Sequence, residues 1–498
     1  KISKNINDMK PRIKHFSLAL LGIVVAAGCN DFGDMNINPN AVSTPQTAFL
    51  MTNAQKSISS VIGAITPSLY VQYFAETQYD EDARYQTVQF NFNSWYTGPL
   101  KDLDEIILKV EANPDLHIGG GAPENQIAVA RILKVYFMQM MVDRWGPLPY
   151  SEALQGNENY KPNYDSADAI YADLLSELQS AASQVNTSAL GPTGDIIFDG
   201  DMSQWIKFAH TMRARIALRV ADSYPSTAKS EFESAASNLL NSDVFYPYLA
   251  ESANQNPFYT QWINRPAGDY AITDKMDDFM SPKGDLRITK YAEPAPLQDN
   301  GDGITQINEI VGHPYSMENP GSITNAEVSL PGGAIGAGGP GIGQQDAPLP
   351  IITMAEIHFM LAEAAARGWN VTGDAPTHYG LAIKASWEQW GVYEESAYTA
   401  YMAHGDVIYD PTNYKKSIGE QKWVALYPLG YEAWAEWRRL GYPQLEPHEY
   451  PLNPSGQIPL RHAYPASELT LNEDSYNAAL GILGGPDDET TPIFWDVD

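Results

Sequence analysis

Nonpolar residues recur every three or four positions along much of the chain, which is the spacing that places them on one face of an α-helix. This pattern predicts helices over 123–142, 166–185, 203–221, 229–241, 353–368, 375–391 and about 429–440. In 123–142 the nonpolar residues surround nearly the whole helix, so we expect it to be buried. Helices of this length joined by short turns are typical of packed helical hairpins. The pattern predicts a mainly α fold with a TPR-like helical-hairpin superhelix, although the sequence shows no strict repeat.

Two long segments interrupt the helical pattern. Residues 250–349 are rich in Asn, Gly, Pro and Tyr and end in a glycine-rich loop, and residues 443–498 are again loop-rich. The glycine-rich loop lacks the ending of a P-loop and no βαβ unit flanks it, so a surface loop is favoured over a nucleotide site. We therefore expect one domain over 49–498, with 49–249 and 350–442 mainly helical. Long irregular segments inside a compact domain are usually functional.

The start of the chain has the features of a signal peptide. Lys10, Arg12 and Lys14 form a basic region, and a run of twelve nonpolar residues follows over 16–27. Twelve helical residues span about 18 Å, which is short of the ~30 Å hydrocarbon core of a membrane. The sequence Ala-Ala-Gly-Cys at 26–29 resembles the lipobox of bacterial lipoproteins.

This resemblance implies that residues 1–28 are upstream residues and a lipoprotein signal peptide, and that Cys29 carries the lipid. Residues 29–48 would then be a lipidated tether. The acidic stretch Asn30–Asp34 looks like the surface-export signal of Bacteroidota lipoproteins, so we expect a lipid-anchored protein in the outer membrane that faces the cell exterior. The alternative is a plain secretory signal with an incidental cysteine.

The net charge and the cysteine content exclude several classes of function. The chain has 61 acidic and 31 basic residues and a net charge of −30. A field of this sign repels phosphate backbones, so we expect no binding of nucleic acid. The single cysteine excludes a disulfide scaffold and a thiolate zinc site.

No catalytic motif stands out. HExxH and GxSxG are absent, and with 61 acidic residues no pair of carboxylates is informative without geometry. We therefore expect a protein that is not an enzyme, with a surface glycoside hydrolase as the alternative. Asn300, Asp302 and Glu309 match three positions of a calcium loop. Gln298 stands at position one instead of Asp, and a plain Asx-rich turn is the alternative.

Aromatic residues outside the helical pattern give the strongest indication of a ligand. The chain holds 29 Tyr and 11 Trp against 15 Phe. Tyr and Trp combine a nonpolar face, on which a sugar ring can lie, with a polar edge that can bind hydroxyl groups. We predict a glycan-binding shelf made by two irregular segments, and its expected residues are Tyr79, Arg84, Tyr85, Tyr259, Trp262 and Tyr270.

Several motifs together resemble those of the SusD/RagB family of outer-membrane lipoproteins. They include an NxNPN sequence at 36–40, a DxxGxxPYxEA turn at 143–153 and an AEAAxRGW helix end at 362–369. The others are found at 170–178, 205–219, 418–445, 458–468 and 494–496. One motif departs from the family: its DPR sequence appears as Asp285-Leu286-Arg287, which loses the stiff proline.

The resemblance implies a SusD-like, TPR-based α fold and a role in nutrient capture without catalysis. Such a lipoprotein binds an oligosaccharide at the cell surface and delivers it to a SusC-like TonB-dependent transporter of the outer membrane. The alternative cargo is a peptide or another non-glycan ligand. Most of the motifs also have an evident structural role, so they indicate the family without marking a ligand site.

Overall fold

The computed structural model describes residues 46–264, 268–296, 309–337 and 343–497. The predicted signal peptide, Cys29 and nearly all of the predicted tether lie outside this part of the chain. Residues Thr47–Asp498 group into one compact unit. Within the described ranges, no helix has both the length and the nonpolar character that crossing a membrane requires.

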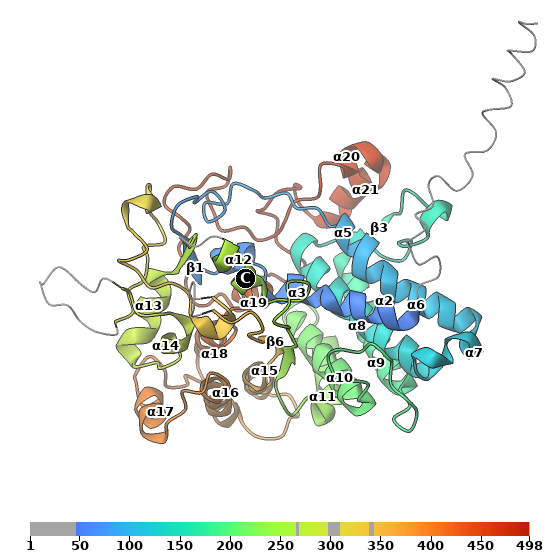
Figure 1. The fold of residues 1–498 in the computed structure, drawn as a ribbon, viewed down its shortest axis with the longest axis horizontal. Helices are drawn as coiled ribbons and strands as arrows, with labels where there is room; N and C mark the ends of the chain where they lie inside the picture. Colours follow the sequence, from blue (N-terminus) through green and yellow to red (C-terminus); the bar gives the residue numbers. More distant parts are fainter. Residues whose placement is uncertain (1–45, 265–267, 297–308, 338–342, 498) are drawn as a thin grey trace, which may run out of the picture. The chain divides into compact units, whose positions relative to one another are not determined.

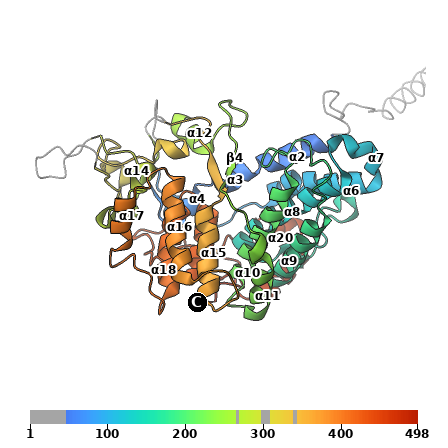
Figure 2. The same cartoon turned by 90° about the horizontal axis from the view of Figure 1, so that it is seen from below.

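Two groups of helices build most of this unit (Figure 1). The first group comprises α2 (Thr47–Lys56), α3 (Ile58–Ile62), α4 (Thr66–Tyr70), α6 (Lys101–Ala112), α7 (Pro114–His117), α8 (Pro123–Trp145), α9 (Ala167–Gln184), α10 (Met202–Arg219) and α11 (Pro225–Ala235). The second comprises α15 (Met354–Ala366), α16 (Ala375–Gln389), α17 (Glu395–Met402), α18 (Tyr414–Ala425) and α19 (Gly430–Leu440). Consecutive helices of the first group pack against each other from α8 to α11. In Figure 2, α15, α16 and α18 lie side by side next to α10. The predicted mainly α, TPR-like fold is confirmed.

The local sequence explains where the main helices begin and end. Pro123 occupies the first turn of α8, where its missing N–H costs nothing, and Gly146 ends the helix with a φ of 79°. Nearly the whole surface of α8 is buried, as the pattern predicted. Asp201 caps α10, because its carboxylate accepts hydrogen bonds from the backbone N–H groups of Ser203 and Gln204.

Some helices differ from the prediction. The helix expected at 229–241 begins earlier, at Pro225, because a proline fits the first turn of a helix. It ends at Ala235. The C-terminal segment, predicted as loop-rich, also contains α20 (Glu468–Leu471) and α21 (Glu473–Leu483). The pattern did not predict α6 or α18.

The described part of the chain also contains three short two-stranded antiparallel sheets. Strand β1 (Phe74–Glu76) pairs with β5 (Tyr270–Ile272), β2 (Leu148–Pro149) with β3 (Tyr164–Asp165), and β4 (Val244–Tyr246) with β6 (Leu349–Ile352). The irregular segment also holds the short helices α12 (Pro257–Asn264), α13 (Asp274–Met280) and α14 (Ile288–Tyr291). The pairing of β1 with β5 brings together the two segments that carry the predicted aromatic residues.

Candidate functional site

Charged residues from the sequence motifs meet in a buried ion network. The Arg215 guanidinium on α10 makes two hydrogen bonds to the Glu356 carboxylate on α15, at 2.7 and 2.8 Å. Arg439 on α19 makes two 2.6 Å hydrogen bonds to Glu363 on α15. Burial alone would raise the pKa of Glu363, but Arg439 lowers it below its usual value. These pairs are buried, so their role is to hold α10, α15 and α19 together.

The remaining charges of the network are also paired. Arg219 contacts Glu432 at 2.7 Å and also pairs with Glu436, which accepts a further 2.7 Å hydrogen bond from Lys422. Burial opposes ionisation of Glu436, and the surrounding Arg439, Lys422 and Arg219 hold its pKa well below the usual value. Every carboxylate named here therefore has at least one cationic partner.

Two other motifs close the C-terminal packing. The indole of Trp495 donates to the Asp143 carboxylate at 3.0 Å, and Arg438 donates to the backbone carbonyl of Asp143 at 2.9 Å. Asp285 and Arg287 form a fully buried ion pair at 2.6 Å. The leucine that replaces the proline of the DPR motif therefore does not prevent an ion pair between its two neighbours.

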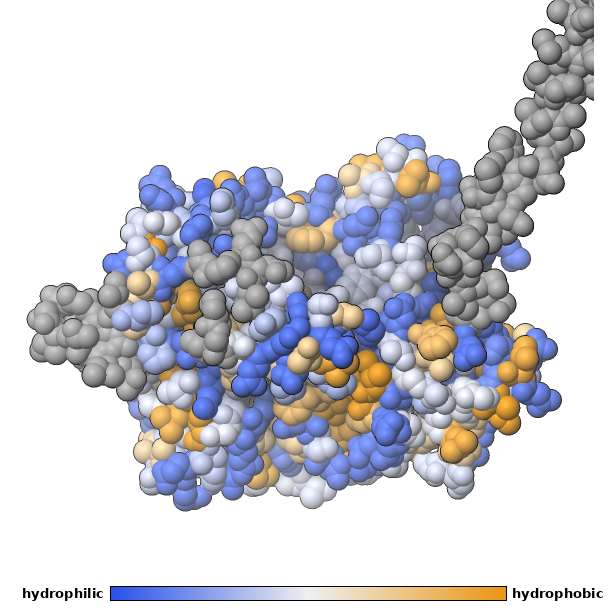
Figure 3. Space-filling model, in the orientation of Figure 1, coloured by the Kyte–Doolittle hydropathy of each residue, from blue (hydrophilic) through white to orange (hydrophobic). Residues whose placement is uncertain are grey.

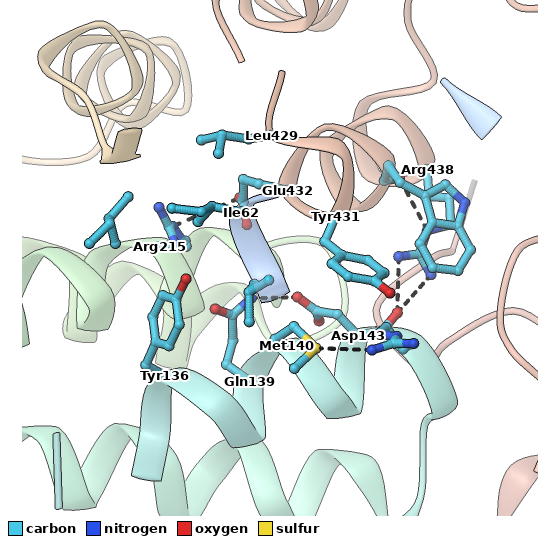
Figure 4. A pocket seen from close by; sticks show the side chains of 14 residues that line it. Ile62, Tyr136, Gln139, Met140, Asp143, Arg215, Leu429, Tyr431, Glu432 and Arg438 are labelled. Carbon is cyan, nitrogen blue, oxygen red and sulfur yellow. Dashed lines mark hydrogen bonds and ion pairs between the residues drawn. The ribbon is translucent and has the colours of Figure 1, made fainter. Parts of the chain in front are cut away.

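A cavity beside this network is too small for a sugar. Figure 4 shows the side chains of Tyr136, Gln139, Asp143, Arg215 and Glu432 around it. Its volume is about 40 Å³, which is enough for a few water molecules at most. The motif residues described above thus stabilise the packing of the helices.

Three of the predicted shelf residues are buried, and the prediction for them is corrected. Tyr85 is 0% exposed, and its hydroxyl accepts a hydrogen bond from the backbone N–H of His448. Burial raises its pKa to about 12. Trp262 is 2% exposed and packs against Phe74 and Tyr270, and Tyr270 is itself buried. These rings lie in the core of the irregular segments, so they cannot offer a face to a sugar.

The other three predicted residues lie at or near the surface. Tyr79 is 63% exposed. Arg84 forms an ion pair with Asp80 at 3.3 Å, and its Nε donates to the Tyr450 carbonyl at 2.6 Å. Arg84 therefore attaches its loop to a C-terminal segment, which is a positioning role. Tyr259, on α12, is partly buried.

Two residues that directly precede Tyr79 in the sequence line a pocket of about 600 Å³. The residues that line it are Thr77, Gln78, Pro296, Gly321, Ile323, Thr324, Asn325, Ala326 and Leu330. None of these is charged, so the pocket suits a neutral ligand. We call it the loop pocket.

Two lining residues of the loop pocket are held in place by hydrogen bonds to the backbone of Gly268. The Thr77 hydroxyl and the Asn325 amide both donate to the Gly268 carbonyl, at 3.0 and 2.9 Å. Gly268 has a φ of 68°, a left-handed conformation that favours glycine. The sequence did not predict Gln78 or Asn325 as residues of a ligand site. The only available signal was the turn-rich composition around them, which does not distinguish a ligand site from an ordinary loop.

A buried carboxyl group lies at the base of the loop that carries Tyr79. Glu76 is the last residue of β1, and its carboxyl accepts a 2.9 Å hydrogen bond from the backbone N–H of Ala83. Burial raises the pKa of Glu76 to about 8, although this hydrogen bond acts in the opposite direction. Glu76 thus closes the loop from 76 to 83.

The predicted calcium loop falls largely outside the described residues. Asn300 and Asp302 lie in the undescribed range, and the backbone carbonyl of Glu309 accepts a hydrogen bond from Ala295. Within the described ranges, no group of three or more His, Cys, Asp or Glu residues is arranged to hold a metal ion. The calcium site therefore stays a prediction.

Comparisons with known proteins find relatives of both sequence and fold. A SusD-like family model described as "Starch-binding associating with outer membrane" matches residues 39–465. A solved chitin-binding protein is 26% identical with a TM-score of 0.76, over 91% of this chain and 100% of that chain. A chitin-binding SusD homologue from Flavobacterium johnsoniae is 22% identical with a TM-score of 0.70, over 91% and 98% of the two chains.

A SusD homologue from Bacteroides fragilis is 23% identical with a TM-score of 0.76, over 91% of this chain and 100% of that chain. No curated protein matches the chain significantly. The family model covers most of the residues, and the helices and irregular segments have the arrangement of solved SusD homologues. The chain therefore belongs to the SusD-like family.

Proposed function

We propose that this protein is a cell-surface lipoprotein that binds a neutral oligosaccharide and delivers it to a SusC-like TonB-dependent transporter in the outer membrane. The observation that carries the proposal is the loop pocket, which has no charged lining residue. The residue that follows its lining residue Gln78 in the sequence is Tyr79, whose ring is exposed. A neutral sugar needs hydroxyl and amide partners together with a nonpolar face, and both kinds of group are present.

The relatives support glycan as the class of cargo. The matching family is described as starch-binding, and two solved structures of the same fold are chitin-binding proteins. Starch and chitin are both neutral polymers of pyranose sugars. In this proposal Tyr79 lies against one sugar face while Gln78 and Asn325 bind hydroxyl groups. The lipid on Cys29 and the surface orientation belong to the same proposal.

Affinity gel electrophoresis tests this function. Protein produced without residues 1–29 is run through gels that contain soluble starch or glycol chitin, and one of the two is expected to retard it. Tyr79→Ala should reduce the retardation because the ring is lost, whereas the matched variant Tyr79→Phe keeps the ring and should behave like the wild type. The melting temperature of both variants should equal that of the wild type, since Tyr79 is mostly exposed.

The same samples test the alternatives. Analysis of the polysaccharide after incubation should show no shortened product, because the protein is proposed to bind and not to cleave. Released product would support a hydrolase instead. Normal migration of the wild type through both gels would contradict the proposal for these two glycans and would favour peptide or other cargo.

A further inference from the structure

A second cavity shares no lining residue with the loop pocket. Its volume is about 440 Å³, within the range of small-ligand sites. It is formed by α5 (Asn93–Trp95) with the turn that follows it, by the loop around 156–162, and by α20 with the residue after it. In Figure 3, hydrophobic side chains gather over α20 and α21, where Leu469, Leu471 and Ile482 are exposed. We call this cavity the α20 pocket.

A buried amide joins two parts of the α20 pocket wall. Asn472 is 5% exposed and lines the pocket. Its Nδ2 donates to the Pro162 carbonyl at 3.0 Å, which fixes the orientation of the amide, because a carbonyl oxygen can only accept. Its Oδ1 then has no partner among the described residues. The Asn472 amide thus joins the end of α20 to the loop around 156–162 and is itself held in place.

An exposed aromatic ring lies at the same pocket. Tyr160 is 75% exposed, and within the described segments its side chain makes no hydrogen bond and no ring contact. Its loop is nevertheless well fixed, because the Glu152 carboxylate accepts hydrogen bonds from Asn159 and from the backbone and side chain of Asn163. A rigid loop that holds an unpacked ring in solvent provides a surface on which a ligand can lie.

The polar lining favours a neutral ligand. Two charged residues line the pocket, Lys101 and Glu468. Lys101 pairs with Glu105 at 3.1 Å, and the Glu468 carboxylate accepts a 2.7 Å hydrogen bond from Tyr164. Both charges therefore already have partners. The remaining polar side chains include the amide of Asn93, which is suited to a hydroxyl group.

One lining residue of the α20 pocket has a strained backbone. Leu154 lines the pocket and has a φ of 64°. A leucine in the left-handed region is unfavourable, and such residues are concentrated at functional sites.

We propose that the α20 pocket is a second carbohydrate site, in which a neutral sugar ring lies on Tyr160 and one of its hydroxyl groups binds the side-chain amide of Asn93. The inference rests on the proposed function and extends it from one site to two. A single stretch of chain joins the sites, since Thr77 and Gln78 line the loop pocket whereas Asn93 and Thr97 line the α20 pocket. A long glycan that reaches both sites would bind with avidity, which a short one cannot.

The test compares variants that should all fold. Tyr160→Ala removes the exposed ring, and Tyr160→Phe is its matched control. Asn93→Ala removes a partly exposed amide that makes no side-chain hydrogen bond in the described part of the chain. Each protein, produced without residues 1–29, is titrated with whichever of soluble starch and glycol chitin retards the wild type. Tyr160→Ala and Asn93→Ala should each weaken binding about fivefold, the effect of losing one ring or amide contact. Tyr160→Phe should bind like the wild type.

Hydrogen exchange provides a second measurement on the same proteins. Adding the polysaccharide should slow exchange in peptides that cover 156–163 and 468–473, and Tyr160→Ala should remove this protection. If the wild type and Tyr160→Ala bind equally and these peptides are unprotected, the α20 pocket is not a carbohydrate site. If Tyr79→Ala still weakens binding in that case, the proposed function stands without the second site. Failure of the wild type to bind either polysaccharide would overturn both.

Discussion

The buried carboxyl of Glu76 should make the stability of the protein depend on pH in a predictable direction. Its pKa is about 8 in the folded chain, against an ordinary value of 4.5. The unfolded chain therefore releases this proton from about pH 4.5 upward, while the folded chain keeps it. The stabilisation of the folded chain that comes from the raised pKa of Glu76 is complete below pH 4.5 and is lost as the pH rises through 8.

The magnitude follows from the two pKa values. One pKa unit corresponds to about 1.4 kcal/mol, so the complete transition is worth about 5 kcal/mol. Between pH 5 and pH 8 the free energy of unfolding should fall by about 3.5 kcal/mol on account of this one group. Glu76→Gln has no proton to release, and its amide oxygen can still accept the hydrogen bond from Ala83. The contribution of the glutamine to the free energy of unfolding should therefore stay constant between pH 5 and pH 8.

The assay is urea unfolding at pH 5, 6, 7 and 8 for the wild type and Glu76→Gln. The quantity to compare is the difference between the two proteins, because all other titrating groups contribute equally to both. This difference should change by about 3.5 kcal/mol in favour of the variant between pH 5 and pH 8. Glu251→Gln, at an exposed position, is the matched control and should follow the wild type. Parallel curves for the wild type and Glu76→Gln would refute the argument that burial governs this carboxyl.

Two further predictions concern the ion network and the lipid. Arg439→Met leaves the buried carboxylate of Glu363 without its closest cation, so it should lower the free energy of unfolding by about 3–5 kcal/mol in urea titrations. The control Lys229→Met removes a pair on the surface and should cost at most about 0.5 kcal/mol; equal losses would contradict the structural role of the network. Cys29→Ala should abolish labelling with radioactive palmitate and shift the full-length protein out of the membrane fraction, and continued labelling would place the lipid elsewhere.

The fold could be predicted where a helix carries its own strong pattern. In α8 and α15 nonpolar residues are so regularly spaced that burial follows from the sequence. The helix α20 was missed because it has only 4 residues, and α21 was missed because much of its nonpolar surface is exposed, as at Ile482. Periodicity reports burial of one face, so it is weak for a helix that buries little.

The ligand site was harder to predict, for a different physical reason. Tyr85 and Trp262 lie in sequence without helical periodicity, and such sequence was expected to be a surface loop. The structure shows that irregular segments have a core of their own, in which Trp262 packs on Phe74 from a strand far away in the sequence. Burial of this kind depends on contacts between distant segments, which no local pattern records.

The division between the ion network and the loops explains why the family could be recognised while its cargo could not. The network joins α10, α15, α18 and α19, and its pairs require exact residues at exact positions, such as Arg215 opposite Glu356. Those requirements leave motifs in the sequence. The loop pocket constrains the identity of its residues less strictly, since many polar and aromatic side chains can bind hydroxyl groups or a sugar face. Substitutions should therefore separate into two kinds: those in the network lower stability, whereas those at Tyr79 or Tyr160 change binding at constant stability. If a single substitution of Tyr79 or Tyr160 lowered both glycan binding and stability, this division would be wrong.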